Sequence, residues 1–270
     1  MSSLPGTPVG VQARVGVIGG SGVYDPADLQ DARAVKVSTP WGATSAPVEV
    51  GTFHGVPTAF LPRHGKGHSI PPHRINFRAN VWALRSLGVQ WILSPSAVGS
   101  LQERLSPGSF VIPDQFIDFT KTRPTTFFDG DQVYHVPMDT PYCPTLRGVV
   151  AAAAKGLGLA FHDGGTYLCI EGPRFSTRAE SRMFRTFADV IGMTGCPEIA
   201  LARELEMSYA TIAMVTDYDV WAERPVTAEA VMATLRSNHA NSAALLARTI
   251  PKVPWTKDSP YKGTLAAAAL

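Results

Sequence analysis

Two acidic side chains follow an apolar segment at residues 209–215, which we predict to be a β-strand. If the chain stays extended beyond this segment, Asp217 and Asp219 point to the same face. Two carboxylates held together at a dry strand end raise each other's pKa, so that one of them can stay protonated near neutral pH. General acid catalysis needs a protonated group of this kind, and the pair is therefore a candidate catalytic site. A helix cap, a surface turn or a pair of metal ligands would also place two acids here.

Three further segments place polar or glycine residues at the ends of predicted strands, where α/β sheets bind ligands. Residues 19–22 form a Gly-Gly-Ser-Gly turn, whose backbone N–H groups and Ser21 hydroxyl can cradle a phosphate. A plain tight turn and a dinucleotide-binding loop are the alternatives. Arg63 and His64 offer a fork of donors and an imidazole in a glycine-rich loop, although a solvated basic loop would look the same. A later strand ends in hydroxyls and glycine around Ser96, which also mark ordinary turns.

Other residues allow more than one chemical interpretation. The motif Arg63-His64-Gly65 resembles the histidine phosphatase signature, but in that family the motif lies on the first strand of the domain. Phe175 could stack on a ring or a sugar, or be a core aromatic. No metal site is indicated, because three of the histidines lie far apart without ligand spacing: His135, His162 and His239.

The candidate residues depend on helices and strands that alternate along the chain. Strands are predicted at residues 14–18, 89–93, 109–112, 166–170 and 209–215, with several short ones between 47 and 62. Helices are predicted at residues 77–84, 146–157, 177–188, 197–205 and 228–249, the third opened by a Thr177 and Glu180 capping box. This alternation predicts an α/β fold, a single domain with a central, mixed and largely parallel β-sheet flanked by helices. We place the domain at residues 14–250, between tails at 1–13 and 251–270, of which the Pro-rich second tail could be mobile.

Composition excludes several classes of protein. With 45% hydrophobic and 17% charged residues among 270, the chain is too apolar to be disordered. A formal net charge of +2 leaves no basic excess for binding nucleic acid. Three cysteines form no disulfide framework, which fits a reducing compartment. The sequence shows no signal peptide and no apolar run that could cross a bilayer, so we expect a cytoplasmic protein.

Together these segments resemble the trimeric purine nucleoside phosphorylases, in particular their S-methyl-5′-thioadenosine phosphorylase branch. The resemblance covers residues 14–251, and several motifs occur in the family's order, which makes it highly specific. The matching segments are residues 17–22, 63–65, 76–84, 114–118, 171–176, 193–194 with 197–198, and 216–219.

The resemblance implies a purine nucleoside phosphorylase-like fold and an activity. Such enzymes cleave a purine nucleoside with inorganic phosphate, in purine and methionine salvage, and need no cofactor beyond this co-substrate. It implies a homotrimer, in which His135 reaches the neighbouring subunit's site near the 5′ group. The implied phosphate contacts come from Ser21, Arg63, His64, Ser96 and Thr194. The implied nucleoside contacts come from Phe175 and Met193 at the ribose, from Ala97, Ser176, Asp217 and Asp219 at the base, and from Val231 and Met232 at the 5′ group.

The two carboxylates favour a 6-aminopurine, because a 6-oxopurine would suit an Asn-type side chain better. Asp217 would protonate the departing adenine. Asp219 would accept a hydrogen bond from the 6-amino group or support Asp217. The chain departs from the branch at Gly195 and Cys196, where its residues resemble those of members that act on 6-oxopurines. It also departs at Gly192, where some relatives carry Asn. The alternatives are therefore a phosphorylase of broader or 6-oxopurine preference, a histidine phosphatase, and a nucleoside-binding module without activity.

Overall fold

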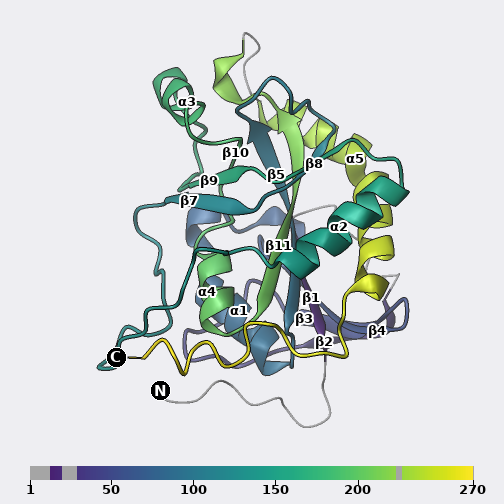
Figure 1. Ribbon diagram of the computed structural model, residues 1–270, viewed down its shortest axis with the longest axis vertical. Coiled ribbons are helices and arrows are strands. Elements are labelled where there is room, and N and C mark those ends of the chain that lie inside the picture. The colour runs from purple at the N-terminus through teal and green to yellow at the C-terminus, as the bar shows by residue number, and fades with distance from the viewer. Residues whose placement is uncertain (1–12, 20–28, 223–226, 270) are drawn as a thin grey trace.

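The computed structural model describes residues 13–19, 29–222 and 227–269, and eleven strands of this part form one sheet (Figure 1). The strands are β1 (Val15–Gly19), β2 (Gln30–Val35), β3 (Val48–Phe53), β4 (Val56–Pro62), β5 (Trp91–Ser100), β6 (Phe110–Ile112), β7 (Gln115–Phe119), β8 (Phe161–Asp163), β9 (Thr166–Ile170), β10 (Val190–Gly192) and β11 (Ser208–Asp217). The α-helices are α1 (Phe77–Ser86), α2 (Pro144–Gly156), α3 (Arg178–Phe184), α4 (Glu198–Glu204) and α5 (Ala228–Thr249). Short 3₁₀ helices are η2 (Lys66–His68), η3 (Pro72–Arg74), η4 (Asp219–Trp221) and η5 (Ile250–Lys252).

Strand β5 lies at the centre of the sheet. It pairs in parallel with β1 and along most of its length with β11, while its last residues pair antiparallel with β10. Further parallel pairs join β1 to β4, β10 to β9, β9 to β7 and β6 to β8, whereas β2, β3 and β4 form an antiparallel edge. The predicted fold, a mixed and largely parallel sheet within an α/β domain, is confirmed.

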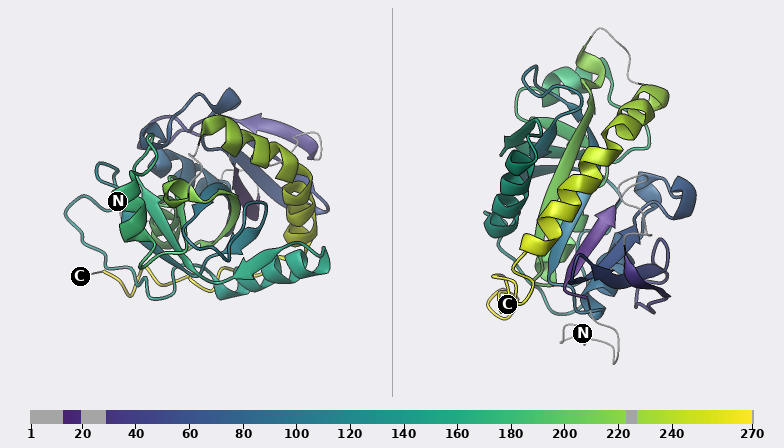
Figure 2. Two further views of the ribbon diagram at one scale, coloured as in Figure 1. Left: turned by 90° about the horizontal axis from the view of Figure 1, so that it is seen from above. Right: turned by 90° about the vertical axis from the view of Figure 1, so that its right-hand side faces the viewer.

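Helices cover both faces of the sheet, so most strands are apolar on both sides. In β1, Val15 and Val17 pack into the core beneath α2 and α5, whereas Ile18 packs into the core beneath α1 and α4. Figure 2 shows α5 running along the sheet beside α2. Of the helices that the structure describes, none is long and apolar enough to span a membrane.

Local signals explain where several helices begin. Helix α1 is capped by Asn76, whose side chain accepts the backbone N–H of Ala79. The predicted capping box of α3 is confirmed, since Thr177 and Glu180 each accept the other's backbone N–H. Helix α5 has the predicted bounds.

One prediction about β5 is wrong. The strand was expected at residues 89–93, followed by a turn at Gly99, yet it continues to Ser100. The reason is long-range pairing, because β11 runs alongside β5 from Ser208 to Asp217 and satisfies its backbone. The hydroxyls and glycine of this segment are therefore held on a buried strand rather than in a surface turn.

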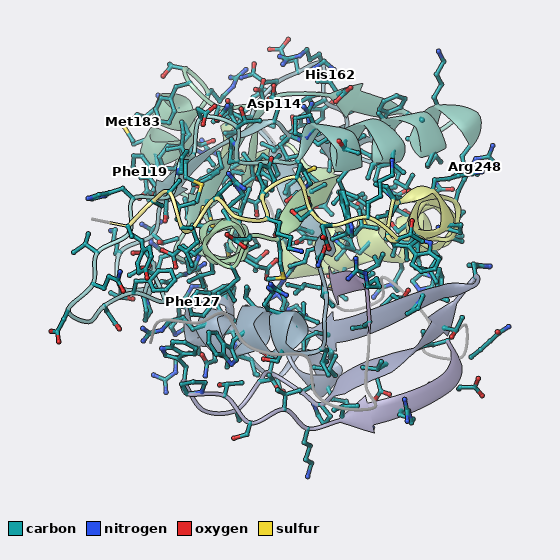
Figure 3. The ribbon with its side chains drawn as sticks, turned by 60° about the horizontal axis from the view of Figure 1, so that its bottom comes forward. Asp114, Phe119, Phe127, His162, Met183 and Arg248 are labelled. Carbon is teal, nitrogen blue, oxygen red and sulfur yellow. The ribbon has the colours of Figure 1, made fainter. Side chains whose placement is uncertain are left out.

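The described part of the C-terminal segment, residues 251–269, packs against the body of the protein instead of extending as a mobile tail. It crosses the end of the molecule opposite α3, drawn in yellow in Figure 1, and Figure 3 shows this end turned toward the viewer. Arg14 Nε donates to the carbonyl of Trp255 at 2.9 Å, and the Leu265 N–H donates to Glu206 Oε1 at 2.9 Å. The ring of Tyr261 lies 3.3 Å from the guanidinium carbon of Arg203.

Candidate active site

A cavity of about 280 Å³ opens where β4, β5, β10 and β11 end or approach their ends. This is the edge at which α/β sheets bind ligands. Ten predicted site residues line it: Arg63, His64, Ser96, Ala97, Phe175, Met193, Thr194, Asp217, Val231 and Met232. Segments far apart in the sequence thus meet at one site.

Four predicted site residues do not line this cavity. Ser21 lies outside the described residues. Ser176 is buried beside the lining residue Phe175, and its hydroxyl has no hydrogen-bond partner among the described residues. Asp219 is buried behind Asp217, and His135 is exposed, away from the cavity of its own chain.

One end of the cavity carries small hydroxyl donors. Ser96 Oγ on β5 and Thr194 Oγ1, which follows β10, lie 3.2 Å apart, and either can donate to the other. Both side chains are buried, so an anion that enters here meets donors with little competing water.

Arg63 is bound chiefly by the protein itself, although it was expected to contact phosphate. Its side chain is 1% exposed and forms a buried ion pair with Glu198, with Nη2 3.0 Å from Oε1 and Nε 3.3 Å from Oε2. Nη2 also donates to Ser94 Oγ at 2.6 Å, and Nη1 donates to the carbonyl of Pro95 at 3.0 Å. One Nη1 hydrogen has no hydrogen-bond partner among the described residues, so any direct contact of Arg63 with an anion depends on it.

One ring nitrogen of His64 is hydrogen-bonded to the protein backbone. Nδ1 lies 2.8 Å from the carbonyl oxygen of Ile70, and the ring stacks on that of His68 at 3.9 Å between centroids. Burial lowers the pKa of His64 to about 4, and the neighbouring Arg63 acts in the same direction. The imidazole is therefore neutral at physiological pH.

The other end of the cavity carries Asp217, whose arrangement with Asp219 differs from the one predicted. Strand β11 ends at Asp217, and Asp219 begins η4 with a left-handed φ of 48°. This turn directs the Asp219 N–H to Asp217 Oδ1 at 2.8 Å, while Thr216 Oγ1 lies 2.7 Å from Asp217 Oδ2. The two carboxylates do not simply face each other along an extended strand.

The pKa of both carboxyls is raised, but mutual repulsion is not the main cause. Burial is the largest cause for Asp217, and the hydroxyl of Thr216 opposes it. Burial also dominates for Asp219, with the charge of Asp217 a smaller contribution. Asp219 Oδ2 is buried without a hydrogen-bond partner among the described residues. A dry environment therefore favours a protonated acid here.

The remaining wall is apolar. Val231 and Met232 of α5 line it as predicted, together with Leu235, which sequence analysis did not single out. Leu235 lies four residues after Val231, so the helical period could have identified it. Phe175 and Met232 are 40% and 38% exposed, which places both at the open side.

Two buried groups behind the cavity were not predicted. Glu198, fully buried, accepts hydrogen bonds from Arg63, Ser94 and, at 2.6 Å, from Tyr209 Oη. A Cβ on Gly192 would lie 2.0 Å from the hydroxyl of Tyr167. Gly192, where some relatives carry Asn, is thus required here because Tyr167 fills the space that a side chain would need.

Among the described residues, no group of three or more His, Cys, Asp or Glu side chains could hold a metal ion. The described side chains that line the cavity are hydrogen-bond donors and acceptors and apolar groups.

Comparisons with known sequences place the chain in a family. The phosphorylase superfamily matches residues 14–251. S-methyl-5′-thioadenosine phosphorylase from Pyrococcus abyssi is 57% identical over 241 residues, covering 89% of this chain and 93% of the relative. The enzyme of the same name from Saccharolobus solfataricus is 53% identical over 255 residues, covering 94% of this chain and 93% of the relative.

Solved structures give the same grouping. A methylthioadenosine phosphorylase from an antarctic soil metagenomic library has a TM-score of 0.90 at 43% identity, covering 96% of this chain and 93% of its own. A mutant adenosine/methylthioadenosine phosphorylase from Schistosoma mansoni, in complex with methylthioadenosine, has a TM-score of 0.86 at 38% identity, covering 95% and 96%. The chain therefore belongs to the phosphorylase superfamily, as a pentosyltransferase of its S-methyl-5′-thioadenosine phosphorylase group.

Proposed function

We propose that this protein cleaves S-methyl-5′-thioadenosine with inorganic phosphate, releasing adenine and 5-methylthioribose 1-phosphate. The observation that carries the proposal is a single cavity with hydroxyl donors at one end, a buried carboxyl at the other and an apolar wall formed by α5. Each part matches one part of the reaction: an anion, a purine and a methylthio group.

Phosphate is a poor nucleophile toward a ribosyl carbon, so the transition state resembles an oxocarbenium ion with weak bonds to both partners. Ser96 and Thr194, with the remaining Nη1 hydrogen of Arg63, would hold the anion against the sugar. Holding the two reactants together supplies proximity, and the anion stabilises the positive charge on the sugar. Ser21, which lies outside the described residues, is proposed as a further phosphate contact.

The departing adenine gains electron density and needs a proton. Asp217 is the proposed donor, because burial raises its pKa and its carboxyl lines the cavity. Asp219 donates its backbone N–H to Asp217 Oδ1 and thereby orients that carboxyl group. Ala97 and Ser176 are proposed to lie around the base, and Phe175 and Met193 around the ribose.

The apolar side chains of Val231 and Met232 favour a methylthio group over a 5′ hydroxyl, because an unpartnered hydroxyl loses hydrogen bonds there. The second candidate function is a phosphorylase that prefers 6-oxopurines. Gly195 and Cys196 favour it, since they are similar to such members, whereas the buried acid Asp217 favours the 6-aminopurine.

We further propose a cytoplasmic homotrimer that uses no cofactor. His135 is exposed on its own chain, and its backbone N–H is bonded to the carbonyl of Ala268 at 2.8 Å. An exposed imidazole on an anchored segment is available to reach a neighbouring subunit's cavity near the 5′ group.

The proposal is tested by base release from four nucleosides, 5′-methylthioadenosine, adenosine, 5′-methylthioinosine and inosine, each with and without phosphate. Phosphate-dependent release of adenine, fastest from the methylthio compound, is expected. Preference for the inosine compounds would support the second candidate. Release without phosphate would contradict phosphorolysis, and binding without any release would indicate a module without activity.

A further inference from the structure

The tautomer of His64 is set by a hydrogen bond to the backbone. Its Nδ1 lies 2.8 Å from the carbonyl oxygen of Ile70, which can only accept, so Nδ1 carries a hydrogen. Among the described residues only Nδ1 of this ring has a hydrogen-bond partner, and the ring lines the cavity. The nitrogen that remains available to a ligand is therefore Nε2.

The surroundings of His64 keep this nitrogen unprotonated. The ring is buried, the cation Arg63 precedes it at the end of β4, and His68 of η2 stacks on it. The pKa of His64 is lowered to about 4, chiefly by burial; the hydrogen bond to Ile70 opposes this shift, and Arg63 and His68 add to it. No carboxylate in the described part of the chain counts among these influences. At neutral pH, Nε2 therefore has a lone pair and can only accept a hydrogen bond.

Ser96, Thr194 and Arg63, the other described donors at this end of the cavity, do not distinguish one tetrahedral anion from another. The hydroxyls of Ser96 and Thr194 rotate and can either donate or accept, so they can contact a protonated or an unprotonated anion oxygen. The guanidinium of Arg63 only donates, and its charge is already paired with Glu198. These groups can bind phosphate and sulfate oxygens alike, so among the described contacts His64 Nε2 is the acceptor that can discriminate between the two anions.

We propose that His64 selects anions that carry a proton, by accepting a hydrogen bond from the P–OH group of hydrogen phosphate at Nε2. Sulfate has the same tetrahedral shape and the same charge as the hydrogen phosphate dianion, but it carries no proton. A bound sulfate would place an oxygen lone pair against that of Nε2 in a buried site. The inference rests on the proposed function, in which inorganic phosphate is the co-substrate, and adds the atom that recognises it.

The first test is competition in the adenine-release assay at mildly alkaline pH, where the hydrogen phosphate dianion dominates. Sodium sulfate is expected to compete with phosphate about 10- to 100-fold more weakly than phosphate binds, the usual effect of one hydrogen bond to a charged group. Arsenate carries a proton as phosphate does and is expected to replace it. If the inhibition constant of sulfate equals the dissociation constant of phosphate, the wild-type protein alone is enough to overturn the proposal.

The second test uses His64→Asn, whose side-chain amide can still donate to Ile70 but has no atom at the place of Nε2. The backbone bond from the Ile70 N–H to the His64 carbonyl, 2.8 Å long, does not depend on the side chain, which favours an intact loop. The preference for phosphate over sulfate is expected to fall about tenfold or more in this variant. An unchanged preference would contradict the proposal.

Two matched variants serve as controls. Ser96→Ala removes a donor that both anions use, so both are expected to bind more weakly with their ratio kept. His54→Asn makes the same substitution at a turn outside the cavity, where a φ of 47° suits Asn, and is expected to change neither anion.

Calorimetric titration with sodium phosphate or sodium sulfate, without nucleoside, separates this inference from the proposed function. Selective binding of phosphate without phosphate-dependent adenine release would leave the inference standing and refute the proposed activity. If adenine release depends on phosphate but the two anions bind equally well, the proposed activity is supported and this inference is refuted.

Discussion

The substitution Asp217→Asn tests the assigned acid with little change of structure. Asp217 Oδ1 accepts the N–H of Asp219 at 2.8 Å, so the amide oxygen of the variant would take that place. The amide nitrogen would then face Thr216 Oγ1, 2.7 Å from the present Oδ2, and could donate to it. The Thr216 hydroxyl would donate to the carbonyl of Val98, 3.1 Å away. Every local hydrogen bond can therefore be kept, while the transferable proton is lost.

The expected loss follows from the role of a general acid. Positioned acids contribute about 10²- to 10⁴-fold. We expect kcat with 5′-methylthioadenosine to fall about 10³-fold, which corresponds to about 4 kcal/mol in the activation free energy. Stability should not fall. Burial raises the pKa of Asp217 in the folded state above its value in the unfolded chain. The wild type therefore loses stability as the pH rises from the unfolded-state pKa to the folded-state pKa. Because the amide of the variant does not titrate, this pH dependence of stability disappears.

The assay is the initial rate of adenine release against pH, with the thermal midpoint measured in parallel. The wild-type rate should fall as pH rises through the raised pKa of Asp217, because only the protonated carboxyl can donate. The variant should lack this limb and should lose less activity with inosine compounds than with adenine compounds. A variant that folds normally and turns over 5′-methylthioadenosine at the wild-type rate would refute the assignment.

Three further predictions concern the scaffold of the site. Glu198→Gln leaves the buried charge of Arg63 poorly compensated and should cost about 3 to 5 kcal/mol, seen as a thermal midpoint lower by about 10 °C. Gly99→Ala would place a Cβ 2.9 Å from Asp217 Oδ1, so kcat/KM for the nucleoside should fall about tenfold or more in the release assay. Removal of residues 256–270 deletes several hydrogen bonds to the body and should cost about 3 kcal/mol, measured by urea unfolding.

Each of these has an outcome that would contradict it. Glu103→Gln is the matched control for Glu198, because Glu103 is 82% exposed and 3.7 Å from its partner Arg185, so its midpoint should not change. Equal midpoints for both variants would mean that the buried pair contributes nothing. Unaltered kinetics after Gly99→Ala would show that the carboxyl can shift freely, and unaltered unfolding after truncation would show that the C-terminal segment does not stabilise the fold.

The sequence allowed prediction wherever the determining signal is local. Helix α5 and the cap at Thr177 follow from periodicity and from side chains within one turn. The anion and base ends of the cavity were likewise marked by polar residues after apolar strands. Such signals place residues near the site, but they do not give the conformation.

The errors arise where distant segments decide the structure. Ser96 lies on a strand because β11, more than a hundred residues later, pairs with it. Glu198 has the local pattern of an acid in the first turn of a helix, yet it is buried because Arg63 and Tyr209 surround it. Nothing near Asp219 in the sequence indicates the left-handed turn that separates it from Asp217, although Asp tolerates that conformation better than most residues.

The central strand β5 also sets the distance between the two ends of the cavity. Ser96 lies at the anion end of the cavity and Gly99 beside the carboxyl of Asp217, three residues apart on one strand that pairs with β11. At about 3.3 Å per residue this fixes about 10 Å of backbone between the two ends. Inserting or deleting one residue would change this length and turn the following side chains to the opposite face. Substrate preference at this site can therefore diverge by exchanging side chains, whereas changes in length between residues 96 and 99 would break the match between anion and base.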